Sequence, residues 1–157
     1  MRVENVNSFV QGAQSTLLTI SGESGKLGKL FVKNPPYIGK EVSVKIGIVG
    51  DLKGEVIYTM DENCGLFLAS RFMMSMGFEI NEFNDMAKEA VKELANMISG
   101  NAANALFSQG VKVDITTPTY ANKGEASGFV TPGSTLLCMP IHFEGEQVFE
   151  VDLHLHE

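Results

Sequence analysis

Two polar residues, Glu93 and Asn96, stand three positions apart, and Gly100 follows four positions after the asparagine. On a helix, residues three apart are surface neighbours, with Cβ atoms about 5–6 Å from each other. The sequence therefore sets a carboxylate beside an uncharged amide, and the glycine removes bulk from the same face one turn later. This pattern favours a face that enters the pocket of a partner; an ordinary solvated helix surface is the alternative interpretation.

Residues 82–108 must position this pair, and they predict one long helix with two distinct faces. At 3.6 residues per turn, one apolar stripe collects Phe83, Ala87, Ala90, Val91, Leu94, Ile98, Ala102 and Ala105. The opposite face carries Glu89, Glu93, Asn96, Gly100 and Ala103. Asn101 lies nearer the apolar stripe, which predicts a buried structural hydrogen bond. Gly100 fits either close approach of a partner's backbone or packing against a neighbouring helix.

The rest of the chain predicts an α+β fold in a single domain, residues 1–157, because no linker, charge block or repeat divides it. Hydrophobic periodicity predicts helices over 4–19 and 63–76, and strands over 29–33, 41–49, 54–60, 111–115, 134–143 and 147–156. A loop is expected over 119–133. Because the strands come as adjacent hairpins, we expect an antiparallel or mixed sheet of about six strands, packed with the long helix and two further helices.

Composition excludes several classes of function. The net charge of −7 and the absence of a basic run argue against nucleic acid as a partner. The longest apolar stretches fall short of the roughly 18 residues that span a bilayer, and polar residues interrupt the first twelve positions where a signal peptide would be apolar. We therefore expect a cytoplasmic protein with no membrane partner.

The residues that could bind a metal give a weaker signal. Cys64 and Cys138 stand alone without a C-x-x-C pairing, so reduced, structural thiols are expected. His154 and His156 share one face of a strand and could bind a metal ion. No third ligand is apparent near them in the sequence. Surface histidines are therefore the preferred interpretation, and no metal site is predicted.

The run NDMAKEAVKELANMISGNA, residues 84–102, resembles the signature helix of the CheX/CheC family of response-regulator phosphatases. The core of that signature is E-x-x-N followed by a glycine four residues later, here Glu93, Asn96 and Gly100. The order of elements is also similar, so the resemblance spans nearly the whole chain. Two departures stand out. Four residues before Glu93, where the family usually has Asp or Ser, this chain has Glu89, and only one credible copy of the helix is present. The resemblance is therefore to the single-site CheX type, with a CheC-like fold.

This resemblance implies a function and a role for each site residue. Members of the family hydrolyse the aspartyl phosphate of a CheY-like receiver domain, which supplies its own Mg²⁺ and lysine, so no cofactor is expected in this chain. Asn96 would orient the attacking water and Glu93 would dock on the receiver lysine. Glu89 and Gly100 would contact the partner. A homodimer is also implied.

Two functions compete with this hypothesis. A non-catalytic module of the same fold could bind a receiver or a flagellar-switch partner without needing the E-x-x-N pair. A regulatory domain that senses a small ligand is the other alternative, but the chain lacks the convergent polar residues that such a pocket needs.

Overall fold

The computed structural model describes residues 1–156, and three α-helices and eight strands lie within them. In chain order the elements are α1 (Val3–Ser21), β1 (Lys26–Leu27), β2 (Phe31–Lys33), β3 (Val42–Gly50), β4 (Lys53–Met60), α2 (Glu62–Met74), α3 (Asp85–Ser108), β5 (Val113–Ile115), β6 (Thr119–Asn122), the 3₁₀ turn η1 (Ala126–Phe129), β7 (Leu136–His142) and β8 (Val148–His156). No helix among the described residues is long and apolar enough to cross a membrane.

All strand pairs are antiparallel, in the order β1-β7-β8-β4-β3-β5, with β2 also on β7 and β6 also on β3. This confirms the α+β class and the antiparallel sheet. The expected count of about six strands was too low. The additional strands, β1 and β6, have two and four residues and lie in segments that the sequence assigned to a turn and a loop. Strands of this length are too short to show an alternating pattern.

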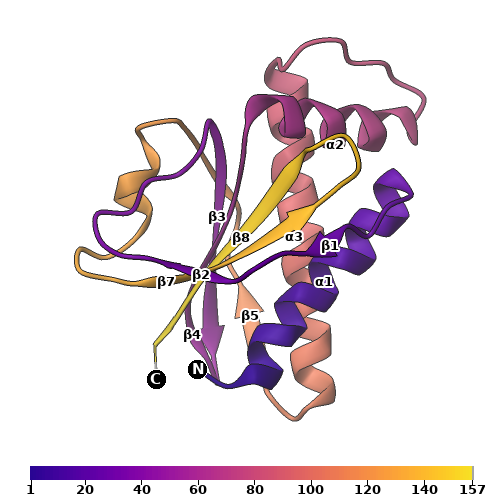
Figure 1. Cartoon of the computed structure of the whole chain (residues 1–157). Coiled ribbons are helices and arrows are strands. Elements are labelled where there is room, and N and C mark those ends of the chain that lie inside the picture. The colour runs from indigo at the N-terminus through magenta and orange to yellow at the C-terminus, as the bar shows by residue number, and fades with distance from the viewer. Residues whose placement is uncertain (157) are drawn as a thin grey trace.

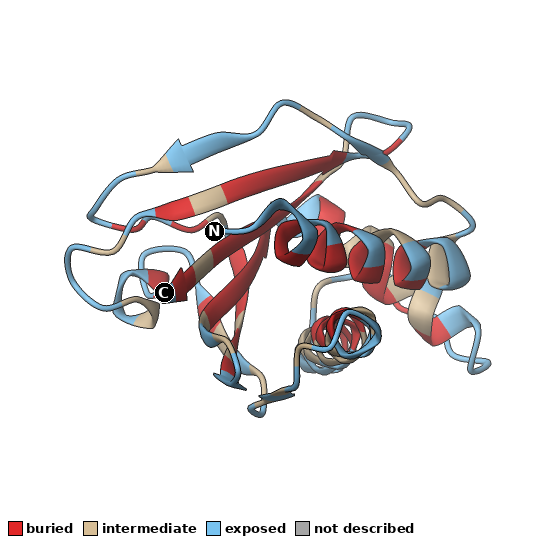
Figure 2. Cartoon of the chain, turned by 90° about the horizontal axis from the view of Figure 1, so that it is seen from below, coloured by how far each residue is buried: buried red, intermediate tan, exposed pale blue. Residues whose placement is uncertain are grey.

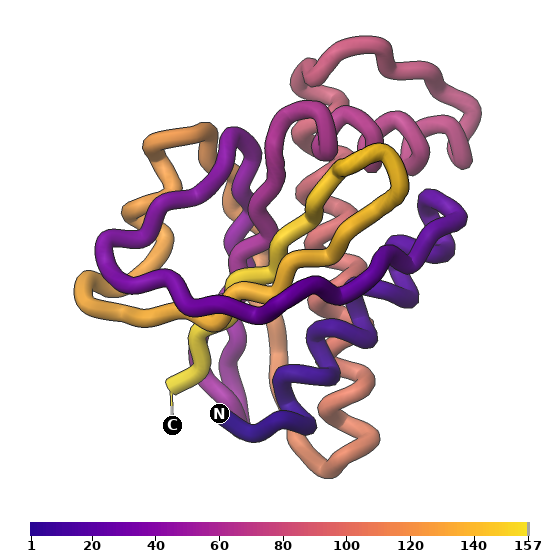
Figure 3. The backbone as a smooth tube through the Cα atoms, in the orientation of Figure 1, coloured from indigo at the N-terminus to yellow at the C-terminus, as the bar shows by residue number. Residues whose placement is uncertain are grey.

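The three α-helices lie on one side of the sheet, and Figures 1 and 3 show α1 and α3 side by side against it. The short helix α2 packs on α3 at the end where α3 begins. Figure 2 shows that the buried residues of α1 and α3 turn toward the strands. The main hydrophobic core fills this interface and includes Leu17, Ile46, Tyr58, Leu94 and Leu153.

A glycine sets the close approach of α1 to α3. A Cβ at Gly12 would lie 2.8 Å from the amide nitrogen of Ala102 and 2.8 Å from the carbonyl oxygen of Ile98, both backbone atoms of α3. Gly100 differs, because a Cβ there would meet nothing within 4 Å. The interpretation of Gly100 as a helix-packing residue is therefore wrong, and Gly12 has that role.

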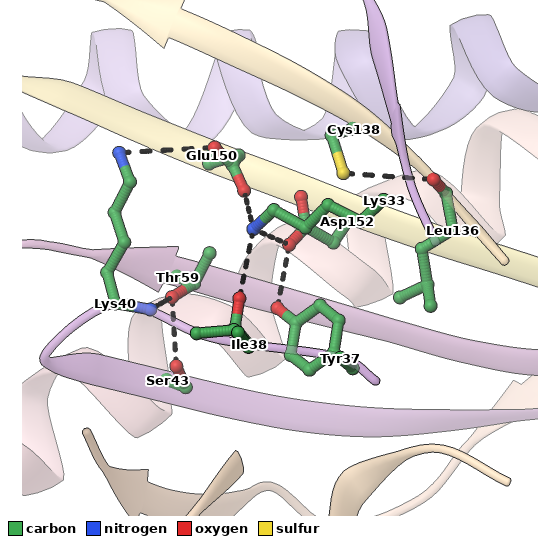
Figure 4. A network of polar contacts seen from close by, with 10 residues as sticks. All are labelled: Lys33, Tyr37, Ile38, Lys40, Ser43, Thr59, Leu136, Cys138, Glu150 and Asp152. Atoms are coloured by element: carbon green, nitrogen blue, oxygen red, sulfur yellow. Dashed lines mark hydrogen bonds and ion pairs between the residues drawn. The ribbon is translucent and has the colours of Figure 1, made fainter. Parts of the chain in front are cut away.

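The other face of the sheet carries a buried polar network, drawn in Figure 4. The Tyr37 hydroxyl donates to Asp152 at 2.7 Å, and the Lys33 ammonium donates to Asp152 at 2.9 Å and also pairs with Glu150. Burial raises the pKa of Glu150 to about 7; Asp152 adds to this increase and Lys33 opposes it. These contacts hold the end of β2 and the segment after it against β8.

Candidate functional site

The helix that carries Glu93 and Asn96 begins at a well-defined cap. The side chain of Asn84 accepts a hydrogen bond from the backbone amide of Ala87 at 3.0 Å, so α3 begins at Asp85 rather than at residue 82. Phe83 precedes the helix and packs, half-buried, against the core. The asparagine three residues before Ala87 is the sequence signal that marks this start.

Burial of one side of α3 fixes which residues face outward. The predicted apolar stripe is largely confirmed, since its buried members are Ala87, Ala90, Val91, Leu94, Ile98 and Ala102. Ala105 is half-buried. One polar anchor on this side, Ser99, was not predicted from the sequence. Its hydroxyl lies 2.8 Å from the hydroxyl of Tyr58 on β4 in a fully buried contact. This contact fixes the rotation of α3 about its own axis relative to the sheet.

Glu93 is exposed on the outward side of α3, and Asn96 and Gly100 beside it are half-buried. Within residues 1–156, neither Glu93 nor Asn96 has a side-chain hydrogen bond or an ion pair. Glu89 is also exposed, but its carboxylate lies 3.4 Å from the Lys92 ammonium. The structure thus leaves Glu93 and Asn96 available to an external partner.

The other two asparagines of this part of α3 have different surroundings. Asn101 donates to the Thr16 hydroxyl at 2.7 Å and so connects α3 to α1. The expected structural hydrogen bond exists, but the expected burial is wrong, because Asn101 itself is exposed and only Thr16 is buried. The side chain of Asn104 is exposed and forms no hydrogen bond within the described residues.

Glu93 and Asn96 offer charge and hydrogen bonding on the outward side of α3. A carboxylate there can bind a cation of a partner, and the amide can hold a water molecule or a polar group. Both of the chain's cysteines are buried free thiols, and burial raises the pKa of Cys64 to about 12, so this thiol is poorly suited as a nucleophile. The arrangement suits the positioning of groups that a partner supplies.

The antiparallel sheet with its helical layer is the architecture of the CheC-like proteins. The family model "Chemotaxis phosphatase CheX" matches residues 42–142. The chain is also 31% identical over 150 residues to the CheY-P phosphatase CheX of Thermotoga maritima, covering 96% of this chain and 93% of that protein. The chain therefore belongs to the CheX family of chemotaxis phosphatases.

Solved structures agree with this assignment. The CheX–CheY–BeF₃–Mg²⁺ complex of Borrelia burgdorferi gives a TM-score of 0.77 at 29% identity, over 99% of this chain and 100% of that one. The chemotaxis protein CheX of Desulfovibrio desulfuricans gives a TM-score of 0.80 at 24% identity, over 98% of this chain and 100% of that one. The second likeness supports the fold alone.

Proposed function

We propose that this protein is a phosphatase that hydrolyses the aspartyl phosphate of a CheY-like receiver domain. The observation that carries the proposal is the E-x-x-N pair itself: Glu93 and Asn96 stand next to each other on the outward side of α3 and have no partner within residues 1–156. The relative from Thermotoga maritima is a CheY-P phosphatase, which supports the same activity for this chain.

In the proposed mechanism, the task of this chain is positioning. An acyl phosphate is already reactive, so hydrolysis requires a water molecule held in line with the phosphorus–carboxylate bond. The amide oxygen of Asn96 accepts a hydrogen bond from this water. An amide suits the task because it stays uncharged beside a phosphoryl group, whereas a carboxylate would be repelled.

Glu93 supplies the orientation of the complex. Its carboxylate forms an ion pair with the lysine of the receiver, and the charge-assisted bond fixes the angle at which Asn96 enters. The two roles need neighbouring side chains on a rigid element, and a spacing of three residues on α3 provides this.

Glu89 and Gly100 extend the proposed contact surface on either side of the pair. The open space at Gly100 lets the backbone of a receiver approach α3 closely. Glu89 already pairs with Lys92, so we assign it a smaller contribution to docking. No cofactor of this reaction is assigned to this chain. Mg²⁺ would belong to the receiver, in keeping with the CheX–CheY complex that contains it.

We also propose a homodimer formed through the sheet edge at β1 and β2. The segment from Lys26 to Lys33 ends the sheet on that side and exposes Leu27, Leu30, Phe31 and Val32. Edge strands with exposed apolar side chains are templates for pairing with another chain. Sedimentation equilibrium should give twice the monomer mass for the wild type and for Phe78→Lys, which changes another exposed phenylalanine, outside the sheet. Phe31→Lys should give the monomer mass, and an unchanged dimer would contradict this interface.

The direct test of the proposed activity is the decay of a phosphorylated CheY-like receiver in the presence of much less than one equivalent of this protein. We expect the decay rate to rise in proportion to the protein added, with many receivers turned over per molecule. Binding without any acceleration would instead favour the non-catalytic receiver-binding module.

A further inference from the structure

Three side chains of the kinds that bind metal ions meet on the sheet, away from α3. Glu55 on β4 pairs directly across from His154 on β8, and His156 follows on the same face of β8. One ligand atom from each residue can be chosen so that all three lie within 4.8 Å of one another. Val56 and Leu153, the neighbours that point the opposite way, are part of the helix-covered core. The triad is therefore on the face of the sheet opposite the proposed phosphatase site.

The hydrogen bond of His154 leaves its second ring nitrogen available to a metal ion. Its Nδ1 lies 2.9 Å from the carbonyl oxygen of Thr135. A carbonyl can only accept a hydrogen bond, so we assign the proton to Nδ1, and Nε2 then keeps a free lone pair. Metal-binding histidines usually fix their second nitrogen in this way, through a carbonyl or a carboxylate.

Glu55 contributes a buried carboxylate of which one oxygen has no hydrogen-bond partner among the described residues. The residue is only 8% exposed, and its Oε1 has no hydrogen-bond partner within residues 1–156. Its other oxygen lies 3.8 Å from Nε2 of His156. A buried carboxylate oxygen without a partner is costly, and a bound cation would remove that cost.

We propose that Glu55, His154 and His156 form a binding site for a divalent transition metal, of which Zn²⁺ is the representative. Two imidazoles and one carboxylate are a common ligand set for this ion and leave a fourth position for water. His156 has a side chain that is 53% exposed, so it can rotate toward bonds of about 2.0–2.1 Å. The metal links β8 to β4, and the proposal does not depend on the proposed phosphatase activity.

A second group, Cys138, Glu150 and Asp152, has the same compactness but is a poorer metal site. The Lys33 ammonium already lies 2.9 Å from Asp152 and pairs with Glu150, so a cation occupies the position between the two carboxylates. All three residues are also buried. A metal ion would have to displace Lys33 and the chain around it, and this favours the triad at the end of β8.

The test is calorimetric titration of Zn²⁺ into the full-length, metal-free protein, repeated with Glu55→Gln, His154→Ala and His142→Ala. We expect one ion per chain for the wild type. Each triad variant should bind about 100-fold more weakly, because loss of even an outer-shell partner of a metal costs roughly 10–100-fold. His142→Ala is the matched control, since it removes an exposed histidine on β7 outside the triad, and it should bind as the wild type does.

Circular dichroism of each variant separates loss of the site from loss of the fold, and Glu55→Gln keeps the shape of the side chain if His154→Ala does not fold. Absence of saturable Zn²⁺ binding in the wild type would overturn the proposal. Binding that survives the triad variants, or that disappears in Cys138→Ser, would also overturn it, the latter in favour of the buried cluster.

Discussion

At the scale of single residues, the choice of an amide and an acid on α3 follows from charge. A neutral side chain is needed next to the phosphoryl group, and a negative one is useful only where the partner offers a cation. Asn96 meets the first requirement and Glu93 meets the second, at neighbouring positions on the helix surface. Asn101, one turn beyond, has the same chemistry as Asn96 but is held by Thr16, so it is not available in the same way.

The proposed docking role of Glu93 predicts a graded loss of affinity. Glu93→Gln should weaken binding of the BeF₃-activated receiver at least tenfold, about 1.4 kcal/mol, because glutamine has no charge and cannot form the ion pair with the receiver lysine. Glu89→Gln should have a smaller effect, since Glu89 already pairs with Lys92. Fluorescence anisotropy with a labelled receiver measures both constants. Equal affinity for the wild type and Glu93→Gln would contradict the lysine contact.

At the scale of elements, α3 suits the proposed docking because its inner side is packed against α1 and the sheet, whereas its outer side faces outward. Two glycines show this difference, and they predict opposite effects of the same substitution. Gly12→Ala should lower the free energy of unfolding by about 1–3 kcal/mol, because the added Cβ meets α3 backbone at 2.8 Å. Gly100→Ala should raise it by up to about 1 kcal/mol, because alanine is the better helix former and the space is empty.

Chemical denaturation checks both changes, and a receiver-binding assay adds a second test of Gly100. If a partner's backbone approaches this position, Gly100→Ala should bind the receiver more weakly although it is more stable. A variant that is more stable and binds normally would remove Gly100 from the docking surface.

The long periodic elements could be predicted from the sequence, and the reasons for the failures are physical. Helix α3 and strands β3, β4, β7 and β8 were expected within a few residues of their actual bounds, because each buries a regularly spaced row of apolar side chains. The short strands β1 and β6 depend on the neighbours they pair with. The role of Gly12 depends on which helix lies opposite. Glu55 joins the two histidines only through the pairing of β4 with β8, which no local pattern reveals.

At the scale of the whole molecule, the two faces of the sheet have different chemistry. The helix-covered face is the apolar core, and the other face buries carboxylates under the segment that contains Lys33 and Tyr37. The proposed receiver site and the proposed metal site lie on opposite sides of the sheet. We therefore expect Zn²⁺ binding to leave the receiver-docking face of α3 uncovered.

The buried network predicts a pH dependence of stability. The pKa of Glu150 in the folded state is about 7, above its ordinary value of 4.5, so the native state retains this proton when the unfolded state has lost it. The resulting stabilisation is complete below about pH 4.5 and is lost as the pH rises toward 7, by at most about 1.4 kcal/mol per pH unit.

Glutamine imitates the protonated acid without titrating, so Glu150→Gln provides the matched comparison. Urea denaturation between pH 5 and pH 7 should show the wild type losing stability relative to this variant as the pH rises. Parallel stability curves for the two proteins would contradict a proton held by Glu150 in the folded state.

The most direct test of the proposed function is the rate of receiver dephosphorylation with the wild type, Asn96→Ala and Asn104→Ala. Asn104 is an exposed asparagine on the same helix and controls for loss of an amide. We expect Asn96→Ala to lose the acceleration of phosphate loss while it keeps its melting temperature and its affinity for the BeF₃-activated receiver, and Asn104→Ala to behave as the wild type. Full activity in Asn96→Ala would contradict the proposed mechanism.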